Sequence, residues 1–289
     1  MTERPDPMRA PGVLVHMRGP LRDAGDAAAV VAAQLGRSQT DIAATLRRCH
    51  GFWESGVDLA TTDALAQALR AAGMPWYALS AAQVPRPPKP MVARGVDPRP
   101  DDAMLAPVAL SGPAEAIPYT AILAAVPVVF QTTSVRAAAA PTTKGTSVAG
   151  VAMSLATTGG LNLLMKRPGG GASPDAAEAV TDGREMLAMV VLRGPGQWQR
   201  FHVFADRCDY RVLPSPGSST ASNWRELLAL VAARLRPQQA GAAMLKQVIA
   251  GGAGPGPLVV DDDNVLADRL RWLLMSTMLR RMGASDGFA

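Results

Sequence analysis

Six prolines fall between positions 85 and 100, and this density constrains the fold more than any other feature of the 289-residue chain. Proline lacks a backbone N–H and fixes φ, so helix interiors and interior strands of a sheet exclude it. We therefore predict a semi-rigid, proline-rich linker over residues 85–102. It separates a domain at 11–84 from a second domain at 103–250, and residues 1–10 are expected to form a flexible tail.

Short apolar runs alternate with helical patterns in the first of these domains. Ser38 followed by Asp41 has the form of a capping box, which marks the start of a helix. Apolar residues recur at helical spacing after this start, and glycine ends the segment at Gly51. The pattern predicts strands at 12–17, 52–53 and 74–79, and helices at 26–35, 38–50 and 59–72. The predicted order of elements is βααβαβ.

The second domain has a different pattern, in which several apolar segments are interrupted by proline. Strands are predicted at 104–110, 117–130, 186–192 and 198–205. The last two are joined by Gly194-Pro195-Gly196, which indicates a hairpin turn. Asn223 with Glu226 predicts the capped start of a helix that ends before Pro237.

Two further segments complete the predicted organisation. Residues 131–183 are rich in Ala, Thr, Ser and Gly, and we interpret them as a low-complexity insertion. Residues 251–289 are expected to form a hinge and a C-terminal amphipathic helix at 264–281, docked on the second domain. The predicted fold class is α+β: a βααβαβ N-terminal domain followed by a mixed, β-rich second domain with C-terminal helices.

The composition favours a cytoplasmic protein. The chain begins with charges and prolines where a signal peptide would need an apolar core, and two cysteines in 289 residues do not make a disulfide framework. Residues 146–165 are too polar to predict a membrane span. The net charge of +5 comes from arginines that are scattered rather than grouped. We therefore expect neither nucleic acid nor a membrane as the partner.

One weak catalytic pattern is present. Residues 145–149, Gly-Thr-Ser-Val-Ala, lack the second glycine of a nucleophile elbow, although Asp182 and His202 follow Ser147 in the order found in hydrolases. The favoured interpretation is a serine in a loop of small residues. A serine hydrolase using Ser147 remains the alternative.

No metal or cofactor site is predicted. Cys49 and His50 are adjacent, and neighbouring helical side chains diverge by about 100°, so they do not form a chelating pair. The acidic run at 261–264 lacks the glycine and glutamate of a calcium loop and is better explained as a helix cap. Trp224 and Trp272 lie on apolar stripes and are expected to pack in the core. We therefore predict no catalytic, cofactor-binding or metal-binding residues and no cofactor.

Residues 45–57 and 65–76 resemble a known fold. They are similar to the second helix, short strand, third helix and last strand shared by the C-terminal domain of the ribosomal stalk protein and the Clp-protease adaptor family. His50 lies near the position of the adaptor family's pocket histidine. That family's acidic loop is replaced by Arg18-Gly19-Pro20, so the resemblance implies the fold rather than a particular pocket. The second domain is loosely similar to pleckstrin-homology-like bacterial domains.

The sequence thus predicts a non-enzymatic, adaptor-like protein-binding or scaffold protein. A third hypothesis is peripheral membrane association through the C-terminal helix. The identity of the protein partner and the oligomeric state are not indicated by any pattern in the chain.

Overall fold

The computed structural model describes residues 10–99, 104–109, 115–136, 178–194, 197–251 and 256–283. The chain forms two compact units, one of residues 1–131 with 183–289 and the other of residues 132–182. In the second unit, the described residues are the ends of two long strands. The predicted flexible tail, except Ala10, and residues 137–177 of the predicted insertion lie outside the described residues.

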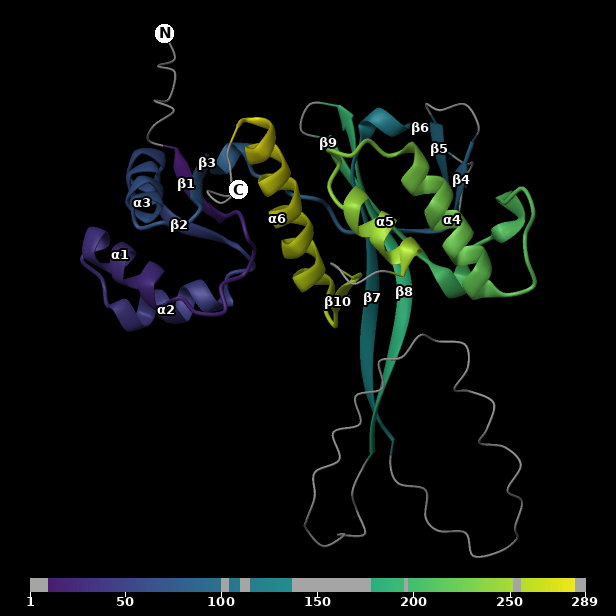
Figure 1. Ribbon diagram of the computed structural model, residues 1–289, viewed down its shortest axis with the longest axis horizontal. Helices are drawn as coiled ribbons and strands as arrows, with labels where there is room; N and C mark the ends of the chain where they lie inside the picture. Colours follow the sequence, from purple (N-terminus) through teal and green to yellow (C-terminus); the bar gives the residue numbers. More distant parts are fainter. Residues whose placement is uncertain are drawn as a thin grey trace, which may run out of the picture. The chain divides into compact units, whose positions relative to one another are not determined.

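The N-terminal elements form a small βααβαβ module (Figure 1). They are β1(Pro11–His16), α1(Gly25–Leu35), α2(Gln39–Arg48), β2(Phe52–Asp58), α3(Leu59–Ala71) and β3(Trp76–Ser80). The strands make an antiparallel sheet in the order β2-β1-β3. Ser38 caps α2 by accepting a bond from the Asp41 amide, as its capping box predicts. The predicted order of elements is confirmed.

The central strand β1 is buried on both of its faces. Leu14 packs with the residues of α1, α2 and α3, whereas Val13 and Val15 belong to a separate hydrophobic cluster on the other face. Successive side chains of a strand point to opposite faces, so an unbroken apolar run requires a cover on each side. The helices of the module supply only one of these covers.

The rest of the chain builds a seven-stranded sheet in the order β10-β7-β8-β9-β4-β5-β6. Its strands are β4(Met91–Pro98), β5(Met104–Ala109), β6(Ile117–Pro118), β7(Ile122–Arg136), β8(Glu178–Gly194), β9(Gln197–Phe204) and β10(Leu258–Val260), with helices α4(Thr220–Arg234), α5(Ala242–Ala250) and α6(Asp263–Arg281). β8 and β9 form the predicted hairpin. The fold is α+β with C-terminal helices, as predicted.

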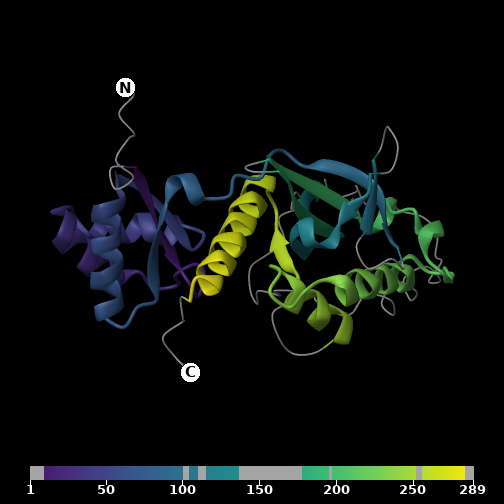
Figure 2. The same cartoon turned by 90° about the horizontal axis from the view of Figure 1, so that it is seen from above.

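This larger sheet is also buried on both faces. Leu187 and Met189 of β8 pack with α4 and α5, whereas Ala188 and Val190 pack with α6. Figures 1 and 2 both show α6, in yellow, beside β10, and the two clusters place it on the other face of the sheet from α4 and α5. Helices therefore cover both faces of this sheet.

Helix α6 covers one face of each sheet. Leu270 and Leu274 lie in the hydrophobic cluster of the seven-stranded sheet, whereas Met275 and Leu279 lie in the cluster of the three-stranded sheet. All four side chains are buried. The predicted docking on the second domain is confirmed, but the amphipathic pattern expected for 264–281 is wrong, because the helix has apolar residues on two sides.

The proline-rich segment is not a linker throughout. Residues 91–98 form β4, which pairs with β5 and β9 inside the larger sheet. The prediction failed because the prolines cluster at 85–90 and at the end of the strand, which leaves 91–97 free to donate backbone hydrogen bonds. The second domain therefore includes residues before position 103.

Other elements also differ from the predictions. The strand predicted at 117–130 is divided into β6 and β7, and residues 131–136 and 178–183 of the predicted insertion belong to β7 and β8. Helix α4 begins at Thr220 with Ser219 as its cap, not at Asn223, whose buried side chain instead bonds Gly217. Helix α5 and strand β10 were not predicted, because each is short and borders a glycine-rich segment that masks its periodicity.

Two glycines of β2 and its preceding turn test how closely α6 packs. A Cβ at Gly51 would lie 2.6 Å from Trp272, whereas a Cβ at Gly56 meets nothing within 4 Å; both residues have positive φ. Positive φ alone costs an alanine roughly 1–2 kcal/mol, and overpacking adds about 1–3 kcal/mol. We expect Gly51→Ala to lower the free energy of unfolding by about 1–3 kcal/mol more than Gly56→Ala does, as measured by urea denaturation. Equal losses would show that Trp272 does not press on this turn.

Candidate functional site

The three-stranded sheet presents an apolar surface that holds a helix, and we call it the docking face. It comprises Val13, Val15, Met17, Phe52, Leu79 and Val84, all buried in one cluster with residues of α6. These residues come from all three strands, β1, β2 and β3, and from the segments that follow β1 and β3. The face is the part of the N-terminal module that its own helices do not cover.

Trp272 of α6 is fixed on this face by a polar contact as well as by packing. Its indole Nε1 donates to the carbonyl oxygen of His16 at 2.8 Å. The ring lies against Gly19 and Gly51. A Cβ added at Gly51 would lie 2.6 Å from the ring and collide with it, whereas one at Gly19 would lie 3.4 Å away, in ordinary contact. The two glycines thus leave room for the indole ring to pack on the backbone, and the carbonyl oxygen of His16 fixes the orientation of the ring.

Arg271 holds the edge of the same contact. Its guanidinium pairs with Glu54 of β2 and with Asp268 of α6, and its Nε donates to the carbonyl of Pro85 at 3.2 Å. It also lies 4.7 Å from the centre of the Phe52 ring. This cation combines ion pairs, a hydrogen bond and a ring contact, and so specifies how the helix is placed.

The contact has the composition of a protein–protein interface. An apolar centre of Met275 and Leu279 is bordered by a tryptophan and an arginine, the residue types that dominate binding energy at such interfaces. The polar groups lie at the border and are paired. The arrangement can bind a helix, and within this chain it binds α6.

Two buried polar side chains of β9 contact the N-terminal end of α6. Arg200 of β9 pairs with Asp263, the first residue of the helix, at 2.6 Å. His202, two residues further along β9, has its Nε2 3.9 Å from Oδ1 of Asp263. Arg200 and His202 are only 2 % and 4 % exposed. This pair ties the start of α6 to the seven-stranded sheet.

The surroundings of His202 oppose its protonation. Burial lowers its pKa to about 4, and the positive charge of Arg200 acts in the same direction, while Asp263 opposes it. The imidazole is therefore neutral near pH 7. Its ring also makes an edge contact with Phe204 at a centroid distance of 6.3 Å.

The residues of the weak catalytic pattern are not brought together as a triad in the described residues. Ser147 lies outside them, and Asp182 is exposed on β8. His202 faces Asp263, a residue that the pattern did not include. The hydrolase alternative consequently stays untested at its nucleophile.

The two cysteine thiols are held in the protonated form. Burial raises the pKa of Cys49 to about 11, and the nearby charge of Asp268 adds to this effect. Burial likewise raises the pKa of Cys208 to about 11. Because the thiolate is the nucleophile and metal ligand, neither thiol is activated for such chemistry at neutral pH.

The acidic run and the tryptophans have structural roles. Asp262 caps α6 by accepting a bond from the Asn264 amide at 2.7 Å. Trp224 packs in the core below α4, as predicted. Trp272 was also predicted to pack in the core; its side chain is partly buried and packs against the hydrophobic cluster of the docking face. Two features of the sequence could have indicated this contact: Trp272 is next to Arg271, and it lies on a helix that has apolar residues on two sides.

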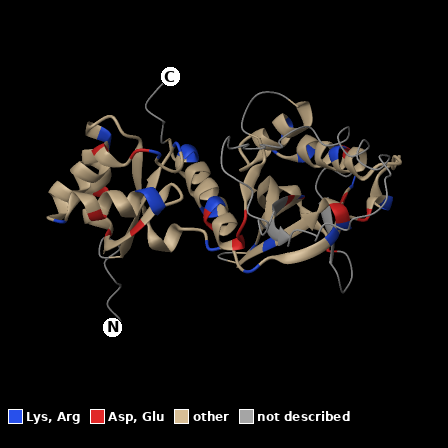
Figure 3. Cartoon of the chain, turned by 90° about the horizontal axis from the view of Figure 1, so that it is seen from below, with Lys and Arg blue, Asp and Glu red and all other residues tan. Residues whose placement is uncertain are grey.

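Charges are mixed over the described elements. Figure 3 shows basic and acidic residues interspersed, and several form ion pairs, such as Arg184 with Asp206 at 2.7 Å. Within the part of the chain that the structure describes, no three His, Cys, Asp or Glu side chains are grouped to hold a metal ion. Among the described helices, none is both long enough and apolar enough to cross a membrane.

Comparison with known proteins gives no match: no protein-family model, no curated protein and no solved structure is significantly similar to this chain. The resemblance to the stalk-protein and Clp-adaptor fold therefore stays a prediction. The observed βααβαβ order agrees with the order on which that resemblance rests.

The buried histidine predicts a pH dependence of stability. Above pH 6.5, His202 is neutral in both the folded and the unfolded chain. Between pH 6.5 and about pH 4, His202 is protonated in the unfolded chain but stays neutral in the folded chain. Between these values His202 should lower the free energy of unfolding by a total of about 3 kcal/mol. In urea denaturation at several pH values, His202→Gln should flatten this decline, and His50→Gln should not. An unchanged decline in His202→Gln would exclude this origin.

Proposed function

We propose that the protein is a non-enzymatic, cytoplasmic protein-binding scaffold whose N-terminal module recognises an α-helix on its docking face. The observation that carries this proposal is the binding of α6 itself. Its Trp272 donates a hydrogen bond to the carbonyl oxygen of His16, and its Arg271 pairs with the carboxylate of Glu54 on β2. A face built for these contacts can accept another helix with the same pattern.

The recognised pattern follows from the contacts of α6. A partner helix would carry an arginine and a tryptophan in sequence, an apolar residue three positions after the tryptophan, and another four positions later. This spacing places the two apolar residues and the tryptophan on one side of a helix. Glu54 adds selectivity, because it favours a cation at the first position and disfavours an anion.

The contacts also indicate which part of the chain would separate. Helix α6 is tied to the seven-stranded sheet by Leu270 and Leu274, by the Arg200–Asp263 pair and by β10, which lies three residues before it. The N-terminal module could therefore exchange α6 for a partner helix while α6 stays on the second domain. A partner must compete with a helix in the same chain, whose effective concentration is on the order of millimolar.

The alternatives receive no support from a specific contact. The membrane hypothesis needs an apolar face of the C-terminal helix for lipid, yet Leu270, Leu274, Met275 and Leu279 are buried against protein. The hydrolase hypothesis rests on Ser147, which lies outside the described residues, and His202 of the same pattern faces Asp263, a residue that the pattern does not include.

A peptide with the sequence of residues 263–282 tests the proposal. We expect the labelled peptide to bind the full chain carrying Trp272→Ala and Leu279→Ala at least tenfold more tightly than wild type, because the substitutions weaken the competing α6. Fluorescence anisotropy measures the affinity. A peptide carrying the same two substitutions is the matched control, and it should bind neither chain.

A charge exchange identifies the surface that the peptide occupies. Adding Glu54→Arg to the weakened chain should reduce peptide binding, and a peptide with Arg271→Glu should restore it. Absence of binding to every variant, or binding that ignores the charge at position 54, would refute helix recognition by the docking face.

A further inference from the structure

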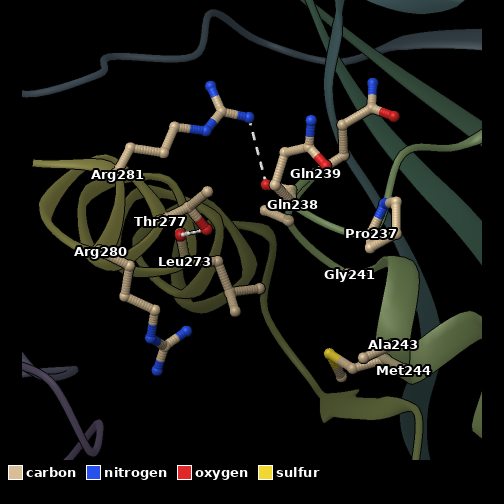
Figure 4. A pocket seen from close by; sticks show the side chains of 11 residues that line it. Pro237, Gln238, Gln239, Gly241, Ala243, Met244, Leu273, Thr277, Arg280 and Arg281 are labelled. Atoms are coloured by element: carbon tan, nitrogen blue, oxygen red, sulfur yellow. Dashed lines mark hydrogen bonds between the residues drawn. The ribbon is translucent and has the colours of Figure 1, made fainter. Parts of the chain in front are cut away.

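A recess lies on the second-domain side of α6, away from the docking face. It has a volume of about 380 Å³ and is formed by the segment before α5, the first turn of α5 and the C-terminal half of α6 (Figure 4). Successive helical residues are about 100° apart, so Leu273 and Thr277 of the recess lie opposite Met275 and Leu279 of the docking face. We call this cavity the α5–α6 recess.

The floor of the recess is apolar and fixed. Leu273 of α6 and Met244 of α5 line it, and both pack against the buried cluster of the seven-stranded sheet. The hydroxyl of Thr277, which also lines the recess, donates to the carbonyl of Leu273 at 2.7 Å. That polar group is therefore satisfied within the helix and does not require a ligand partner.

The rim of the recess is positively charged. Among the described residues, its lining includes Arg280 and Arg281 but no aspartate or glutamate. Arg281 extends over the opening, where its Nη2 donates to the carbonyl oxygen of Gln238 at 3.1 Å (Figure 4). A guanidinium has five N–H donors and binds carboxylates in a bidentate manner, so a neutral carbonyl uses only part of its capacity.

We propose that the α5–α6 recess binds a small amphipathic carboxylate. The apolar part of the ligand lies on Leu273 and Met244, and its carboxylate is paired by Arg281, with Arg280 adding to the positive field. The volume falls in the range of about 300–1,000 Å³ typical of small-molecule pockets, in which apolar walls supply affinity and a few polar groups orient the ligand. The recess shares no residue with the docking face.

Octanoate is a suitable probe, because its parts can be varied one at a time. Isothermal titration of the full chain should show saturable one-to-one binding of octanoate. Each buried methylene strengthens binding by about fourfold, so butyrate should bind at least tenfold more weakly. Octylammonium has the same chain with the opposite charge and should not bind. Equal binding of octanoate and octylammonium, or no saturable binding of octanoate, would overturn the proposal.

Three variants locate the site. Arg280→Gln with Arg281→Gln should weaken octanoate binding at least tenfold, and Ala243→Trp, which fills the recess from the first turn of α5, should abolish it. Arg225→Gln removes an exposed arginine of α4 and should leave the affinity unchanged. Circular dichroism and the Tm confirm that each variant is folded. If the folded double-arginine and Ala243→Trp variants both bind octanoate like wild type, the ligand does not occupy this recess.

Discussion

The burial of α6 between two apolar sheet faces is the constraint on which the rest of the structure depends. Val13 and Val15 on one side and Ala188 and Val190 on the other would be exposed to water without it. Burying one large aliphatic side chain contributes about 1.5–3 kcal/mol, and α6 buries several on each side. A contribution of this size is comparable with the net stability of a whole domain, so neither sheet is complete as an independent unit.

Periodicity in the sequence correctly predicted the elements of the N-terminal module, because each has a local signal such as the Ser38 cap or a terminal glycine. Periodicity did not predict which helix packs on which face of each sheet. The unbroken run Val13-Leu14-Val15 indicates a strand buried on both faces, and the apolar residues of α6 on two sides indicate a helix with two neighbours. The strand and the helix that carry these two signals are far apart in the chain, with His16 and Trp272 separated by 256 positions, and only the fold shows that they pack together.

The candidate sites were less predictable, because they depend on backbone atoms and on contacts between distant segments. Trp272 is oriented by the carbonyl of His16, which carries no residue-specific signal. The pairing of Arg200 with Asp263 joins a strand and a helix that are 63 positions apart. The rim of the recess brings Arg281 next to Gln238, which is 43 positions earlier in the chain. Composition and spacing do not contain such juxtapositions.

The two proposed sites meet in α6 and are therefore thermodynamically linked. A ligand in the recess would contact Leu273 and Arg281 only while α6 is helical and seated on the seven-stranded sheet, so its binding stabilises that state. A seated, ordered helix loses less conformational entropy when the N-terminal module docks on it. Under both proposals, the recess ligand therefore strengthens the docking of α6 on the N-terminal module. A competing partner helix then needs a higher affinity for the docking face in order to displace α6. Because linkage is reciprocal, a partner helix that displaces the N-terminal module from α6 must lower the affinity of the recess for its ligand by the same factor.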